Sequence, residues 1–63
     1  MKDSEKETLF RKIQKKFPVM NILDYTYEKP KSGVYVEIRE IDDYIVHLEI
    51  GVSNVYIWSI QDK

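Results

Sequence analysis

His47, the only histidine of the chain, stands in the middle of the segment YIVHLEI at positions 44–50 and is the first candidate for chemistry. An imidazole beside a carboxylate is half of a hydrolase triad or of a metal site. A triad also needs a serine or cysteine held against the imidazole by a strained turn, and no such motif is present. A metal site needs three or four ligands, yet the chain has no second histidine and no cysteine. We therefore expect no catalytic residue, no metal ligand and no cofactor, and we place His47 on a solvent or interface face.

Three carboxylates, Glu40, Asp42 and Asp43, gather in the segment EIDDY and raise the alternative of a calcium or magnesium loop. An EF-hand loop needs oxygen ligands at alternate positions over about twelve residues with a central glycine, and this segment has neither feature. Aspartate is also common in turns, because its side chain hydrogen-bonds the local backbone. The segment therefore predicts a turn.

Four basic side chains, those of Arg11, Lys12, Lys15 and Lys16, lie on one side of an expected helix. A basic helix face can bind the phosphates of a nucleic acid, although helices also commonly present lysines to water. The two glycines, Gly33 and Gly51, are isolated at expected turns and form no phosphate-binding loop. Nucleic-acid binding through this helix face is therefore kept as an alternative function.

The length and composition limit the chain to one small domain, residues 1–63. Its apolar fraction of 43% is typical of a globular protein, and the absence of cysteine excludes disulfides. The segment MKDSEKETLF is charged and contains no run that resembles a signal peptide or a membrane span. We therefore expect a cytoplasmic protein without a membrane partner. The core of so short a chain is small, and without disulfides dimerisation is the remaining means of stabilising it.

An amphipathic helix is predicted over residues 5–17. Ser4 and Glu7 have the spacing of a capping box, and Pro18 disfavours helical geometry at the residue before it. A helical wheel places one group of apolar side chains on a single stripe that would face the core. These are Leu9, Phe10, Ile13, Phe17 and Met20.

After the helix the apolar period changes to two, which predicts four strands, at about residues 22–28, 33–40, 44–51 and 54–61. The turns between them are KPKSG, EIDDY and GVSN. Pairing Tyr27 with Val34, Ile38 with Val46 and Ile50 with Val55 brings every apolar set to the same side. The expected fold is thus α+β, with one N-terminal amphipathic helix packed on a four-stranded antiparallel meander sheet.

This register directs a second group of side chains to the opposite face of the sheet, which the single helix cannot cover. The group consists of Tyr35, Glu37, Arg39, Ile45, His47, Glu49, Tyr56, Trp58 and Ile60. On this face His47 is expected between Glu37 and Trp58. Asp24, Thr26 and Glu28 are expected to share the same face.

The functional hypothesis is based on the uncovered face, because tyrosine and tryptophan are typical anchors of protein interfaces. Its expected carboxylates outnumber its one cation, which disfavours a phosphate backbone. We predict a small non-enzymatic protein-binding module, an inhibitor or adaptor, whose acidic and aromatic face is analogous to that of small phage-type inhibitors. Its partner would be another protein or a second copy of the chain in a homodimer.

Overall fold

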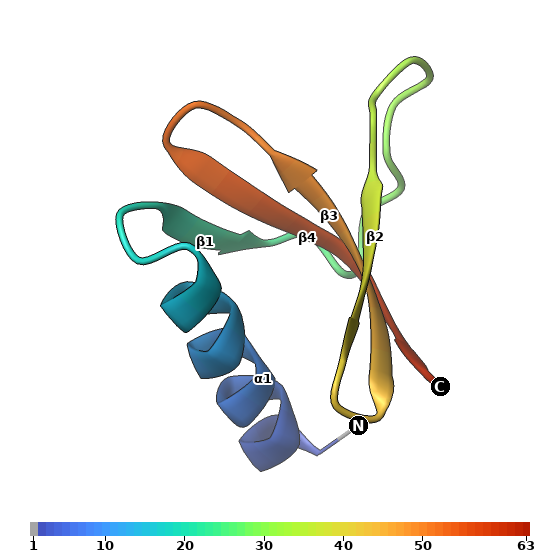
Figure 1. The fold of residues 1–63 in the computed structure, drawn as a ribbon. Coiled ribbons are helices and arrows are strands. Elements are labelled where there is room, and N and C mark those ends of the chain that lie inside the picture. Colours follow the sequence, from blue (N-terminus) through green and yellow to red (C-terminus); the bar gives the residue numbers. More distant parts are fainter. Residues whose placement is uncertain (1) are drawn as a thin grey trace.

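The computed structural model describes residues 2–63 and contains one helix and one four-stranded sheet (Figure 1). The elements follow the chain as α1 (Asp3–Lys16), β1 (Asn21–Asp24), β2 (Glu37–Ile41), β3 (Tyr44–Ile50) and β4 (Asn54–Asp62). The expected content of one helix followed by four strands is confirmed. The strand order in space is β1-β4-β3-β2, with β1 parallel to β4 and the other two pairs antiparallel. The sheet is therefore mixed, and the prediction of a purely antiparallel meander is wrong.

Helix α1 begins at Asp3, two residues before the expected start, with Lys2 as its N-cap residue. Ser4 consequently lies inside the first turn, where its carbonyl accepts a hydrogen bond from Thr8 Oγ1 at 2.9 Å, and not at the cap position that a capping box requires. The helix ends at Lys16, directly before Phe17 and Pro18, as the proline predicts.

The core lies between α1 and one face of the sheet, which we call the helix face. Leu9 and Ile13 are the buried residues of the helix. They belong to one cluster with five buried residues of the sheet, Ile41, Val46, Leu48, Val55 and Ile57. Phe10, Phe17 and Met20 pack at its margin, so the predicted apolar stripe of the helix is confirmed. Burial of each such aliphatic side chain contributes about 1.5–3 kcal/mol.

The register of β2 against β3 differs from the expected one by a single residue. The two strands are joined by the two-residue turn Asp42–Asp43, so that Ile38 lies opposite His47 and Arg39 lies opposite Val46. Asp42 has a φ of 53°, a left-handed conformation that aspartate tolerates better than most residues. Because strand side chains alternate between faces, the shift places Ile41 in the core, 5% exposed, and leaves Ile38 63% exposed on the opposite face.

The β3–β4 pairing agrees with prediction near the turn and departs from it further along. Ile50 lies opposite Val55 and Leu48 opposite Ile57, as expected. A β-bulge then interrupts the register, so that the next pairs are His47 with Ser59 and Val46 with Ile60. Ile60 is therefore directed to the helix face, where it packs against the core, and not to the opposite face.

The connection between β1 and β2, residues 25–36, replaces the expected first hairpin, and we call it the strap. It leaves β1 and crosses the sheet on the side away from α1, where Figure 1 shows it in green. Gly33, with a φ of 87°, and a hydrogen bond of 3.1 Å from Val34 N to Lys31 O form a turn within it. The segment KPKSG thus forms a turn within the strap and does not close a hairpin between two neighbouring strands. We call the face that the strap crosses the outer face.

Candidate functional site

The structure separates the nine side chains that the sequence placed together on one face. Five of them do lie on the outer face: Ile45, His47, Glu49, Tyr56 and Trp58. Glu37 and Arg39 lie opposite the buried Leu48 and Val46, and therefore belong to the helix face, as does Ile60. Tyr35 lies in the strap and is 79% exposed.

His47 has different neighbours from those expected. It lies opposite Ile38 on β2 and opposite Ser59 on β4, while the bulge places Trp58 beside this pair. Glu37 is turned to the other face, so the expected carboxylate–imidazole pair does not form. Nδ1 of His47 is buried and has no hydrogen-bond partner among residues 2–63. Within the same residues, no three His, Asp or Glu side chains are grouped closely enough to hold a metal ion.

An aromatic cluster forms where the strap begins to cross the outer face. The ring of Tyr25 stacks on that of Tyr56 at a centroid distance of 5.3 Å and on that of Trp58 at 5.0 Å. Stacked pairs of this kind contribute about 0.5–1.5 kcal/mol beyond their burial. Trp58 Nε1 also donates a hydrogen bond of 3.2 Å to Glu49 Oε1. The cluster attaches the strap to β4 and holds the indole in one orientation.

Two grooves lie between the strap and the strands beneath it. The first, of about 390 Å³, includes Val36 and Pro30 from the strap and His47 and Trp58 from the sheet. The second, of about 340 Å³, includes Tyr25, Val34, Glu49, Tyr56 and Trp58. Trp58 and Glu28 line both grooves, so the grooves adjoin at the indole. Most of the surface that the two grooves expose is apolar, as is typical of binding sites. The linings also include polar and charged side chains, which are Thr26, Lys29, Ser59 and Gln61 in the first groove and Lys31 and Glu49 in the second.

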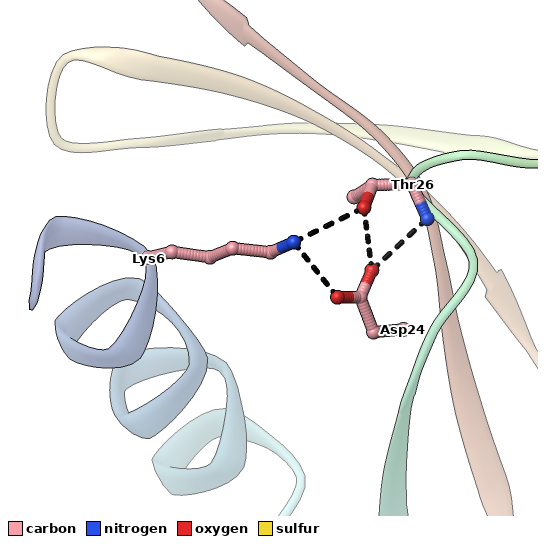
Figure 2. A network of polar contacts seen from close by, with 3 residues as sticks. All are labelled: Lys6, Asp24 and Thr26. Atoms are coloured by element: carbon pink, nitrogen blue, oxygen red, sulfur yellow. Dashed lines mark hydrogen bonds and ion pairs between the residues drawn. The ribbon is translucent and has the colours of Figure 1, made fainter. Parts of the chain in front are cut away.

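A polar network fixes the point at which the strap leaves β1 (Figure 2). Lys6 Nζ of α1 lies 2.8 Å from Asp24 Oδ2, and Asp24 Oδ1 accepts hydrogen bonds from Thr26 N at 2.9 Å and Thr26 Oγ1 at 2.7 Å. Asp24 therefore faces the helix and not the outer face. The network joins the helix, the end of β1 and the start of the strap, so that the strap starts in a defined direction.

The same contacts change the pKa values of the two charged groups. The hydrogen bond to Asp24 raises the pKa of Lys6 and outweighs the opposing effect of burial. Burial by itself raises the pKa of Asp24, but the hydrogen bonds from Lys6 and from the backbone and hydroxyl of Thr26 outweigh it, and the net shift is downward. Both shifts favour the charged forms.

The basic side of α1 is partly neutralised by neighbouring carboxylates. Arg11 forms an ion pair of 2.7 Å with Glu7 one turn earlier in the helix. Lys12 forms an ion pair with Asp42 in the β2–β3 turn. Lys15 and Lys16 are exposed and make no ion pair with a residue in the described range 2–63. Two of the four cations proposed for phosphate binding are therefore already paired.

Sequence reasoning placed Thr26 and Glu28 on this face, but it did not identify other strap residues that line the grooves, among them Tyr25, Pro30, Val34 and Val36. It assigned Tyr25, Val34 and Val36 to the core because they alternate with polar residues. The one available signal was the segment EKPKSG, whose proline and glycine suit a loop that leaves the sheet as well as one that closes a hairpin.

None of the helical structure within residues 2–63 has the length and apolar character needed to cross a membrane. Comparison of the chain with protein-family models, with curated protein sequences and with solved structures gave no match.

Proposed function

We propose that this protein is a small non-enzymatic protein-binding module, an inhibitor or adaptor, that holds an extended segment of its partner in the two grooves of the outer face. The observation that carries the proposal is the position of Trp58, which lines both grooves while Glu49 and Tyr25 hold its ring in place. An aromatic side chain that is fixed before binding supplies a large contact area at little entropic cost.

The shape and chemistry of the grooves favour an extended peptide segment as the occupant. The grooves adjoin at Trp58, and the neighbouring Ile38 leaves an exposed aliphatic side chain on the same face. Aromatic grooves of this kind accept extended, proline-containing segments, because such segments lose little conformational entropy when they bind.

The charge of the outer face is more balanced than the sequence predicted. Asp24 and Glu37 belong to the helix side, and the strap adds Lys29 and Lys31 to the margins of the grooves. We therefore expect binding to depend mainly on apolar contacts and only weakly on salt.

Selection from a display library of random peptides tests this function without a known partner. We expect the immobilised protein to enrich a family of apolar or proline-containing peptides. Replacing the half-buried groove residue with a carboxylate, Val36→Asp, should weaken their affinity at least about tenfold, corresponding to about 1.4 kcal/mol. The matched control is Val19→Asp, because Val19 is 93% exposed and lies outside both grooves. Failure to enrich any peptide, or equal losses in the two variants, would contradict the proposal.

The alternative function, nucleic-acid binding by α1, is favoured only by the exposed Lys15 and Lys16. It predicts that labelled single- or double-stranded nucleic acid is retarded at low salt, and that the double variant Lys15→Glu, Lys16→Glu loses this shift. Retardation by the wild-type protein that is unchanged in Val36→Asp and lost in the lysine variant would favour α1 over the outer face.

A further inference from the structure

Strand β2 is an outermost strand of the sheet, and no strand within residues 2–63 pairs with its outer edge. An unpaired edge presents backbone N–H and C=O groups that can bond to another strand. Two side chains of β2, those of Ile38 and Glu40, are exposed on the outer face. A further strand added beside β2 would extend the sheet at this edge.

The turn that joins β2 to β3 determines which residues of β2 offer their backbone groups to that edge. A tight turn is closed by a hydrogen bond between its first and last residues, here Ile41 and Tyr44, which are paired in the sheet. Hydrogen bonding alternates along an antiparallel pair, so Ile41, Arg39 and Glu37 bond inward to β3. Ile38 and Glu40 consequently direct their N–H and C=O groups outward.

The side chains beside Ile38 make this edge complementary to itself. Glu37 and Arg39 flank Ile38 and both belong to the helix face, where Arg39 Nη2 lies 2.7 Å from Glu37 Oε1. In an antiparallel pair of two β2 strands centred on Ile38, each Glu37 lies opposite Arg39 of the second copy. The two Ile38 side chains then lie opposite each other on the outer face. Opposite charges and apolar pairs in these positions stabilise a sheet by about 0.2–1 kcal/mol each.

A register displaced by one residue loses this complementarity. Centring the pair on Arg39 places the two guanidinium groups opposite each other and Ile38 opposite Glu40 of the second copy. Like charges directly opposite each other destabilise a strand pair. The charges of β2 therefore favour the antiparallel register centred on Ile38 over this neighbouring one, and that register relates two identical chains by a two-fold axis.

We propose that a second copy of this chain binds along β2, in an antiparallel pairing centred on Ile38, and extends the sheet of each copy across a two-fold axis. The surface involved is the edge of β2, which meets the outer face at Ile38. The residues that its test changes, Glu37 and Arg39, lie on the helix face and line neither groove. The inference therefore stands or fails separately from the proposed binding of a partner segment.

Sedimentation equilibrium from low micromolar to millimolar concentration tests the pairing with three variants. The wild-type mass should rise from that of one chain to that of two. Glu37→Arg and Arg39→Glu, taken singly, place like charges opposite each other and should each weaken dimerisation at least about tenfold. The double variant, which exchanges the two charges, should return the dimerisation constant to within a few-fold of wild type.

Circular dichroism of each variant establishes that the fold is intact before the masses are compared. A single-chain mass for the wild-type protein over the whole range would overturn the proposal. A dimer that neither single charge reversal weakens, or that the double variant fails to restore, would place the interface elsewhere and overturn it as well.

Discussion

Ile38 on β2 lies directly opposite His47 on β3, and the two side chains share the outer face of the sheet. An isoleucine therefore occupies the position beside the imidazole at which the sequence predicted the carboxylate of Glu37. On its other side His47 adjoins Ser59 and Trp58, and it contributes to the wall of a groove under the strap.

The register of β2 can be tested by replacing each of its two isoleucines with alanine and comparing the two losses in the free energy of unfolding. Ile41→Ala should lower the free energy of unfolding by about 2–4 kcal/mol, because it leaves a cavity in the core. Ile38→Ala removes an exposed side chain and should change the free energy of unfolding by less than about 0.5 kcal/mol in a dilute, monomeric sample. Urea denaturation followed by tryptophan fluorescence measures both. The reverse order of costs would support the register with Ile38 opposite Val46.

The attachment of the strap to the outer face depends on the stacking of Tyr25. Tyr25→Ala removes its contacts with Tyr56 and Trp58, and should destabilise the protein by about 1–3 kcal/mol while accelerating amide hydrogen exchange in residues 25–36. Tyr35→Ala is the matched control, because Tyr35 is a strap tyrosine that is 79% exposed and lines neither groove. Similar exchange rates in the two variants would show that the stacking does not hold the strap.

The ion pair between Lys6 and Asp24 should stabilise the fold over a defined pH range. The folded-state pKa of Asp24 is lowered, so its contribution is complete above the unfolded-state pKa of about 3.9 and is lost as the pH falls through the folded value. The pKa of Lys6 is raised, so its contribution is complete below about 10.4 and is lost as the pH rises through the folded value.

Asp24→Asn should therefore lower stability by about 1 kcal/mol near neutral pH, and the difference from wild type should shrink as the pH falls below about 4. Urea midpoints measured across the acid range give this difference directly. Asp62→Asn is the control, since Asp62 is exposed and forms no ion pair with residues 2–63. A difference between Asp24→Asn and wild type that is independent of pH would assign the effect to packing and not to charge.

Local patterns were sufficient to predict the helix and one hairpin. The spacing of Leu9 and Ile13 identifies the buried stripe of α1, and Pro18 identifies its end, because both effects arise within a few residues. The segment GVSN likewise predicted the pairing of Ile50 with Val55. In each case, the residues that determine the structure lie within a few positions of one another in the sequence.

The strap and the outer face could not be predicted in the same way, because they depend on pairing between distant segments. Asn21 lies beside Asn54 in the parallel β1–β4 pair, and no turn or loop in the sequence indicates that these two distant segments pair. The outward position of Ile38 follows from a β2–β3 turn of only two residues, Asp42 and Asp43, the first of which has a left-handed conformation. The bulge beside Trp58 redirects Ile60, although the polar Ser59 at the expected inward position was a weak indication of it.

Nuclear magnetic resonance of the isotope-labelled protein, titrated with a peptide from the display selection, tests the proposed binding face most directly. We expect the indole N–H of Trp58 and the amides of Glu28, Val36 and His47 to shift progressively and to saturate at one equivalent, because these residues line the grooves. The amides of Lys15 and Lys16 on α1 should remain unchanged. Saturable shifts confined to α1, with the Trp58 indole unaffected, would contradict the account.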